Sequence, residues 1–502
     1  MKRLITIGIA VITVMALVVP VLAAHPDPGV GNVNFTVMNL DAAENAQVVA
    51  QYVSSGVGAG GPAGTVDAEI PATIHPLSSS GFPIADSGLP DNWSGSVVVS
   101  SDKGVAAFAQ MRWENSAIPT THPRWRTAGA YNGFIEAADT LYLPSLAQRV
   151  GAQISRIAVQ SADAPSTTEM VPFTITFYDR MGNVSGIITD EVNKGAQKTY
   201  DLGEIGGTIP DLGDPWLGSA VIEADDGDPL AAAATMHWVN YSAAYSAVLG
   251  GGTDIYLPSY TRRMPMGEGT PWFQYTGIVV QNLDEAPADV TVYWYDRDGN
   301  ELHSFDDTIP ALSAHGYNTR FIEDSQIPTP PAEFAAAIGF DQNGSVRIVS
   351  DGAEIVAVAN LQWTENHPSS AAASAYTSFS DGDELVFAPQ TFRRVSNDTW
   401  LQYTGLIVQN VGDAACTFDV TWVDRETDEA LLSFTDTLAP GIAHGYNTRV
   451  PSDIPAGHDP ADLGMDYRGA VTFDAEGCDL AAIHNTIWTA WTDNTTYNAF
   501  GQ

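Results

Sequence analysis

Tryptophan recurs at a constant interval along this chain of 502 residues. Successive members of the set lie 125 positions apart: Trp113, Trp238, Trp363 and Trp488. A glycine that opens a short apolar run precedes each of them by 18 to 20 positions: Gly95, Gly218, Gly344 and Gly469. The last two copies also share the string HGYNTR, which begins at His315 and again at His444. Similarity at a fixed period is the signature of repeated structural units, so the chain is predicted to contain four copies of one unit.

Each copy has the period of a β-strand before its tryptophan. Counting back from Trp238, every second residue is apolar: Met236, Ala234, Ala232 and Leu230. This alternation is the strand period, and the small alanines indicate that another sheet approaches closely. The residues beside the four tryptophans on the opposite face are mostly polar, which predicts a water-facing surface: Arg112, His237, Gln362 and Ile487. About seven or eight short strands in roughly 120 residues is typical of a two-sheet β-sandwich.

The points where the pattern restarts give the predicted domain boundaries. These are a signal peptide at 1–24 and sandwich domains at 25–135, 136–252, 253–380 and 381–502. Because the connections are short, the all-β chain is expected to form a rod with limited bending. The first copy lacks the leading strand that the others show as LYLPS, IYLPS or LVFAP. Such a sandwich does without the strand, recruits one from another molecule, or fills the gap with residues 25–31, whose two prolines make them poor strand material.

The first residues have the pattern of an export signal. Lys2 and Arg3 precede an apolar stretch, and the small residues up to Ala24 are typical of a cleavage site. An uncleaved membrane anchor is the alternative, since the stretch is nearly long enough to span a bilayer. Export permits disulfide bonds, so the only two cysteines, Cys416 and Cys478, are predicted to pair.

The charge of the chain limits its partners. Sixty Asp and Glu residues against 21 Lys and Arg residues give a net charge of −39. Because nucleic-acid binding needs clustered cations, the composition argues against that function.

The order of motifs carries a resemblance to a known class. A leading LPS strand, then YTGIVVQN, a strand ending in YDRDGN and a GSV hairpin together resemble the tandem immunoglobulin-like or fibronectin-like modules of bacterial secreted and surface proteins. The resemblance implies a spacer, adhesin or lattice component and brings no catalytic residues. It also implies that Trp113, Trp238, Trp363 and Trp488 are core residues, comparable to the buried tryptophan of immunoglobulin-like sandwiches.

The sequence offers few candidate sites. It has neither a G-x-S-x-G nucleophile elbow nor an H-E-x-x-H zinc motif. Asp296, Asp298 and Asn300 resemble the start of a calcium loop, but the later ligand positions do not fit, and a hairpin turn is the preferred interpretation. Calcium held by loops distant in sequence stays an open alternative, and no other cofactor is expected.

Recurrent arginines and one loop complete the set of candidates. The Asp-Arg pairs and the arginines that follow each leading-strand proline are interpreted as structural ion-pair residues: Arg180, Arg297, Arg425, Arg149, Arg263 and Arg394. The loop after the first tryptophan strand contains Arg124, Trp125 and Arg126, and variable loops on a constant scaffold are a usual place for ligand binding. Packing against the next domain is the alternative for this loop.

These observations predict a secreted, non-enzymatic protein of the cell surface with a structural or adhesive role. Its expected partners are other surface proteins, further copies of itself, or glycans. The alternative is a carbohydrate-binding protein that stacks loop aromatics such as Trp125 and Trp491 on sugar rings. A third hypothesis is an enzyme whose site lies between domains.

Overall fold

The computed structural model describes residues 8–11, 29–115, 126–150, 153–225, 227–238, 241–367, 371–489 and 493–502, with the backbone alone at 8–11, 149–150 and 452. The described chain is almost entirely antiparallel β-structure, as predicted. Its strands fall into four groups that follow the four sequence repeats, and we call these groups unit 1 to unit 4.

Units 1 and 2 contain most of the first half of the chain. The elements of unit 1 are β1 (Gly8–Val11), β2 (Val30–Asn39), β3 (Ala46–Gly58), β4 (Val66–Ile74), β5 (Ser79–Pro83), the 3-10 helix η1 (Ile84–Ser87), β6 (Trp93–Ser101), β7 (Val105–Glu114) and β8 (Arg126–Asn132). Those of unit 2 are β9 (Thr140–Val150), β10 (Gln153–Ser161), β11 (Met170–Asp179), β12 (Val184–Asn193), β13 (Gln197–Asp201), β14 (Trp216–Ala224), β15 (Leu230–His237) and β16 (Ser242–Ser246).

Units 3 and 4 repeat this order. Unit 3 comprises β17 (Asp254–Arg263), β18 (Gln274–Asn282), β19 (Ala288–Asp296), β20 (Glu301–Ile309), β21 (Ala314–Asn318), η2 (Ile322–Asp324), α1 (Pro331–Ile338), β22 (Asp341–Ser350), β23 (Ile355–Trp363) and β24 (Ala372–Thr377). Unit 4 comprises β25 (Leu385–Ser396), β26 (Thr399–Asn410), β27 (Cys416–Asp424), β28 (Ala430–Leu438), β29 (Ala443–Asn447), η3 (Pro451–Asp453), η4 (Pro460–Leu463), β30 (Asp466–Asp474), β31 (Leu480–Trp488), β32 (Asp493–Asn498) and β33 (Phe500–Gly501).

The leading strand decides how many sheets a unit has. In unit 2, β9 pairs with β14 on both sides of a bulge, and its last residues also pair with β10, so one sheet runs β12-β11-β14-β9-β10-β15-β16. The same order recurs in units 3 and 4, and the two halves of each sheet enclose one apolar core. In unit 1 the strand β1 pairs with β6 alone, and the unit consists of two separate four-stranded sheets. The leading strand that the sequence seemed to lack therefore comes from residues 8–11.

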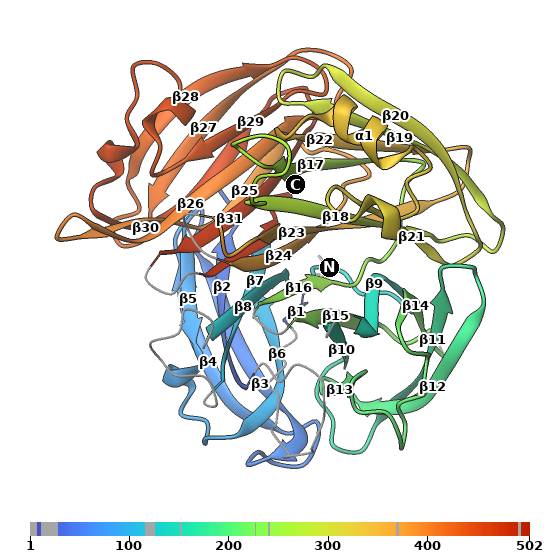
Figure 1. The fold of residues 1–502 in the computed structure, drawn as a ribbon. Coiled ribbons are helices and arrows are strands. Elements are labelled where there is room, and N and C mark those ends of the chain that lie inside the picture. Colours follow the sequence, from blue (N-terminus) through green and yellow to red (C-terminus); the bar gives the residue numbers. More distant parts are fainter. Residues whose placement is uncertain are drawn as a thin grey trace.

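The four units close into a ring, so the predicted rod is wrong (Figure 1). The last long strand of each unit, namely β8, β16, β24 or β32, lies at the centre and contacts its neighbours in cyclic order. Unit 1 is joined to unit 4 because the Asn132 side-chain amide donates a hydrogen bond to the Asn498 carbonyl, at 2.7 Å. Asn498 in turn donates to the Thr377 carbonyl of unit 3, also at 2.7 Å. Short connections bend the chain around this centre, where buried alanines allow the strands to approach closely.

Recurrent arginines fasten neighbouring units. The guanidinium of Arg297 in unit 3 lies over Gly445 of unit 4, where an added β-carbon would be 3.0 Å from Nη1. Arg180 lies over Gly316 in the same way, with 2.7 Å to Nη2, and Arg425 lies over Gly81 of unit 1, with 3.4 Å to Nη1. A side chain in place of the glycine of the HGY string would therefore collide with the arginine of the preceding unit.

The aspartates beside these arginines do not bind them in the described residues. Each aspartate accepts hydrogen bonds from its own turn; Asp296 accepts from the backbone N–H groups of Asp298 and Asn300 at 2.9 Å. This is the hairpin turn that was preferred over a calcium loop. The second arginine set does form the predicted ion pairs, between Arg263 and Asp341 and between Arg394 and Asp466, each at 2.7 Å. The side chain of Arg149 lies outside the described residues.

The strand face beside the tryptophans does not turn to water as predicted. His237 is completely buried, stacks edge-on against Trp113 of unit 1 at 4.8 Å and makes hydrogen bonds with Thr235 and Ser242. Arg112 of unit 1 lies over the Trp488 ring of unit 4, at 5.8 Å from its centroid. Ring closure places these polar residues between units, where a rod would have exposed them.

The four tryptophans differ in burial. Trp113 and Trp488 are 1% and 5% exposed, as expected of core residues, whereas Trp238 and Trp363 are only partly buried. The predicted disulfide is present: Cys416 and Cys478 are bonded, with 5.5 Å between their α-carbons. It joins the start of β27 to the turn before β31, and so lies within unit 4.

Candidate functional site

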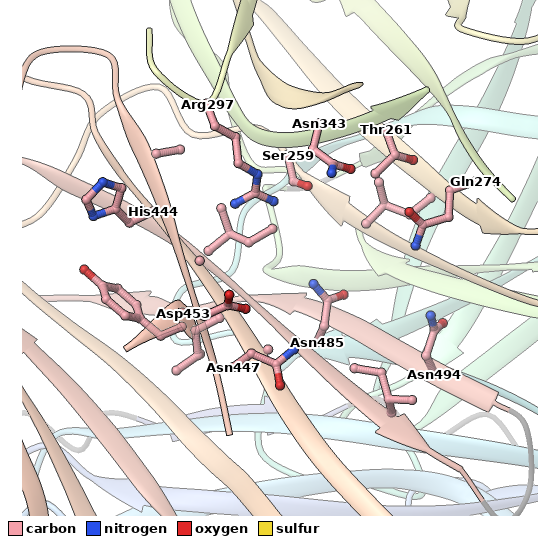
Figure 2. A pocket seen from close by; sticks show the side chains of 18 of the residues that line it. Ser259, Thr261, Gln274, Arg297, Asn343, His444, Asn447, Asp453, Asn485 and Asn494 are labelled. Atoms are coloured by element: carbon pink, nitrogen blue, oxygen red, sulfur yellow. The ribbon is translucent and has the colours of Figure 1, made fainter. Parts of the chain in front are cut away.

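A cavity of about 850 Å³ lies at the contact between units 3 and 4, which we call the open seam. Unit 3 contributes side chains from β17, β18, β22 and β23, and unit 4 contributes side chains from β26, β29, β31 and β32. The volume is within the range of sites that hold small molecules. Figure 2 shows polar side chains from both units converging on this space.

Uncharged hydrogen-bonding groups form a large part of the wall of the cavity, beside several charged side chains. Its amide and hydroxyl side chains are Ser259, Thr261, Gln274, Asn343, Asn447, Asn485 and Asn494. The rings of Trp363, Tyr403 and Tyr446 also line it. Amides both donate and accept hydrogen bonds, and aromatic faces offer apolar contact, so this wall suits a ligand rich in hydroxyl groups.

One amide of the wall has unused hydrogen-bonding capacity. Asn494 is 3% exposed, and its side-chain carbonyl oxygen has no hydrogen-bond partner. A buried acceptor without a partner is costly, and this one lies at a cavity that a ligand can enter. A donor group of a ligand would satisfy it.

The corresponding seam between units 2 and 3 shows what opens the cavity. There Asn360 of unit 3 donates a hydrogen bond to the hydroxyl of Ser145 in unit 2, at 3.3 Å. The equivalent residues of the open seam are Asn485 and Ser259, which both line the cavity. Asn485 instead accepts a hydrogen bond from the Thr496 hydroxyl of its own unit. The same two positions of the repeat are therefore hydrogen-bonded to each other across the seam between units 2 and 3, but line a cavity between units 3 and 4.

Besides Arg263, which forms an ion pair with Asp341, Arg297 is the second arginine that lines the cavity. It lies at the unit 3 side of the cavity and reaches over Gly445, as described above. Burial lowers the pKa of its guanidinium, and the nearby carboxylate of Asp453 opposes that shift. An arginine remains protonated at neutral pH even so, which leaves a fixed donor at the edge of the cavity.

Asp493 is the most perturbed acid of the wall. Burial raises the pKa of its carboxyl group to about 8, although the Asn494 backbone N–H and the charge of Arg112 act to lower it. At neutral pH the group is therefore mainly protonated and can donate a hydrogen bond. A perturbed carboxyl group at a cavity is a common attribute of functional sites.

A histidine of the HGY string is held in place at the cavity. His444 makes a hydrogen bond from Nδ1 to Asp436 at 2.9 Å, and the Tyr446 hydroxyl donates to the same carboxylate at 2.6 Å. Burial alone would raise the pKa of Asp436, but these two hydrogen bonds lower it. The equivalent His315 makes the same bond from Nδ1 to Asp307, at 2.7 Å, and its Nε2 also lies 3.2 Å from the Arg180 carbonyl oxygen of unit 2.

The site predicted from the sequence is a different one. Arg124, Trp125 and Trp491 lie outside the described residues, and Arg126 forms an ion pair with Glu114 at 2.8 Å. The described residues contain no group of three or more His, Cys, Asp or Glu side chains that could hold a metal ion. The cavity residues were missed, although one signal was available. A polar residue stands three positions before each tryptophan, inside an otherwise apolar run: Gln110, Thr235, Asn360 and Asn485.

Comparisons with known proteins do not identify a family. No family model matches the chain. No curated protein matches it either. Within the described residues, no helix is both long and apolar enough to cross a membrane.

Solved structures resemble the chain only weakly. A crystal structure of Thermotoga maritima 1070 covers 26% of this chain and 94% of its own, at 11% identity and a TM-score of 0.18. A glycoside hydrolase family 32 structure from Bifidobacterium adolescentis covers 99% of this chain and 95% of its own, at 7% identity and a TM-score of 0.12. A structure of infectious bursal disease virus, Gx strain, covers 93% and 82%, at 11% identity and a TM-score of 0.10.

Proposed function

We propose that the protein is a secreted, non-enzymatic adhesive protein that binds glycans at the cell surface through the open seam. The observation that carries this proposal is the cavity between units 3 and 4, with its wall of amides, hydroxyls and aromatic rings. Sugar hydroxyls both donate and accept hydrogen bonds, and sugar rings pack on aromatic faces. The immunoglobulin-like character of the four units belongs to the same proposal, since such modules often serve as scaffolds for binding.

The charge of the protein narrows the ligand class. With a net charge of −39, the chain repels polyanions over long distances. The wall contains two arginines, Arg263 and Arg297, against four aspartates, namely Asp298, Asp436, Asp453 and Asp493. These charges favour an uncharged glycan over a sulfated or highly sialylated one.

The test is binding of the secreted form to an array of glycans, followed by calorimetry on any positive oligosaccharide. Asn485→Ala should weaken binding by about tenfold, because it removes one well-placed amide. Asn360→Ala is the matched control, since it removes the equivalent amide at the seam between units 2 and 3. It should leave the affinity for the glycan unchanged. Absence of any glycan binding, or equal losses in the two variants, would contradict the proposed site. Turnover of the bound glycan would contradict the non-enzymatic role.

A further inference from the structure

Unit 1 has the same place for a leading strand as the other units. In unit 2, Leu143 of the leading strand pairs with Ala220, two residues after Gly218 of β14. In unit 1, Val11 pairs with Val97, two residues after the equivalent glycine of β6. The pairings of units 3 and 4, Leu257 with Val346 and Ala388 with Val471, have the same register. Residues 8–11 therefore occupy a conserved structural position, which we call the β6 slot.

The occupant of the β6 slot belongs to the segment that the sequence predicts to be removed on export. Cleavage near Ala24 would separate residues 8–11 from unit 1. Strand β6 would then be an edge strand, with Val97–Ser100 losing the partner shown by the register. An unpaired edge of this kind is a template for strand addition.

A buried tyrosine gives independent evidence that the slot is incomplete without a longer occupant. In units 2 and 3 the equivalent tyrosine hydroxyl donates a hydrogen bond to the leading strand: Tyr245 to the Ser145 carbonyl at 2.8 Å, and Tyr376 to the Ser259 carbonyl. Tyr131 of unit 1 is 1% exposed, and its hydroxyl has no hydrogen-bond partner. The missing acceptor is the backbone carbonyl that follows the proline of a leading strand.

The three complete units define what the slot takes. Leu141 and Leu143 of unit 2 are completely buried, and the equivalents in units 3 and 4 are at most 2% exposed. Each of these pairs precedes a proline, in the strings LYLPS, IYLPS and VFAPQ. A suitable occupant is an extended segment with apolar residues at two alternate positions, followed by proline.

We propose that the β6 slot of the exported chain binds such a segment from a separate secreted protein, by antiparallel strand addition. The backbone of β6 holds the segment, the two apolar side chains enter the core of unit 1, and the Tyr131 hydroxyl donates to the carbonyl beyond the proline. Units 2 to 4 already hold their own leading strands, so only unit 1 offers this site among the described parts of the chain.

The test uses the exported protein and a synthetic peptide with the sequence of Thr140–Val150, TLYLPSLAQRV. The peptide should bind, raise the melting temperature and protect the amides of 97–100 from hydrogen exchange. A control peptide with Asp in place of Leu141 and Leu143 should bind at least about tenfold more weakly. Tyr131→Phe should weaken binding about fivefold, which is the usual effect of one hydrogen bond.

A fusion variant tests the same strand addition without depending on the affinity of a free peptide. The same eleven-residue sequence, joined by a glycine linker ahead of residue 30, should raise the melting temperature and abolish binding of the free peptide. The proposal is overturned if the amides of 97–100 are as protected without peptide as those of 220–223, or if mass spectrometry finds residues 8–11 retained. A dimer that the peptide dissociates would show that the occupant is a second copy and not a separate protein.

Discussion

Two seams of the ring are built from equivalent strands and differ sharply in character. At the closing seam, between units 4 and 1, the buried rings of Phe108 and Tyr497 stack at 4.2 Å within a small apolar cluster. At the open seam, between units 3 and 4, equivalent strands surround a polar cavity of about 850 Å³. Unit 4 takes part in both. A few residues at fixed positions of the repeat therefore decide whether a seam holds the ring together or forms a cavity.

Removal of an aromatic side chain from the closing seam should have the largest effect on the stability of the protein. Phe108→Ala deletes a side chain that is 1% exposed and packs against Tyr497, so we expect the free energy of unfolding to fall by about 3–5 kcal/mol. Trp363→Ala, at the open seam, should cost less than half as much because this ring is only partly buried. Denaturant unfolding measures both values. Equal losses would show that the two seams contribute alike.

The disulfide should have the next largest effect, confined to the unit that the two seams share. The double variant Cys416→Ser, Cys478→Ser removes a link that closes a loop of 62 residues. We expect the free energy of unfolding of unit 4 to fall by about 2–4 kcal/mol. Domain-resolved hydrogen exchange measures the loss. A loss that also reached unit 2 would indicate that the ring unfolds as one cooperative body.

Asp493, at the open seam, should make the stability of the folded protein depend on pH. Burial raises the pKa of its carboxyl group to about 8, above the value near 4 of an unfolded chain. The native protein therefore binds more protons between these values, and stability should fall as the pH rises from about 4 to 8. Asp493→Asn keeps the group neutral and should flatten that part of the profile, measured by thermal unfolding across pH. An unchanged slope would show that the carboxyl group is already ionised in the folded protein.

The smallest effect concerns two equivalent asparagines, Asn360 at the seam between units 2 and 3 and Asn485 at the open seam. Asn360→Ala breaks the hydrogen bond to Ser145 of unit 2 and should cost about 1 kcal/mol of unfolding free energy. Asn485→Ala makes no such break between units and should cost less than about 0.5 kcal/mol. Chemical denaturation of the two variants side by side checks this order. A larger cost for Asn485→Ala would mean that the open seam depends on this residue for folding.

The local structure was more predictable than the assembly. The repeat period, the alternating strand period, the aspartate turns and the Cys416–Cys478 bond all depend on nearby residues or on copies of one pattern, and these features are visible in the sequence. The closed ring was not, because it depends on contacts such as Asn132 with Asn498, which lie 366 positions apart. A rod and a ring have the same repeat sequence and differ only in the sign and size of small bends between units.

The candidate site was missed for the same reason. The alternating strand pattern predicts His237 on a water-facing surface, yet ring closure buries it against Trp113. The cavity at the open seam combines β17 and β23 with β29 and β31. Only a knowledge of which units touch brings these strands together.

The arginines that lie over glycines all reach in the same direction around the ring, from one unit to the next. They point from unit 2 to unit 3, from unit 3 to unit 4, and from unit 4 to unit 1. At the remaining junction the strand register puts Ser55 where the others have arginine. That junction is spanned by the polypeptide, whereas the contact of unit 4 with unit 1 is not and depends on Arg425, Phe108 and Tyr497. Units 4 and 1 can therefore separate without stretching a connecting segment, so this is the junction at which the ring can open while each unit stays folded.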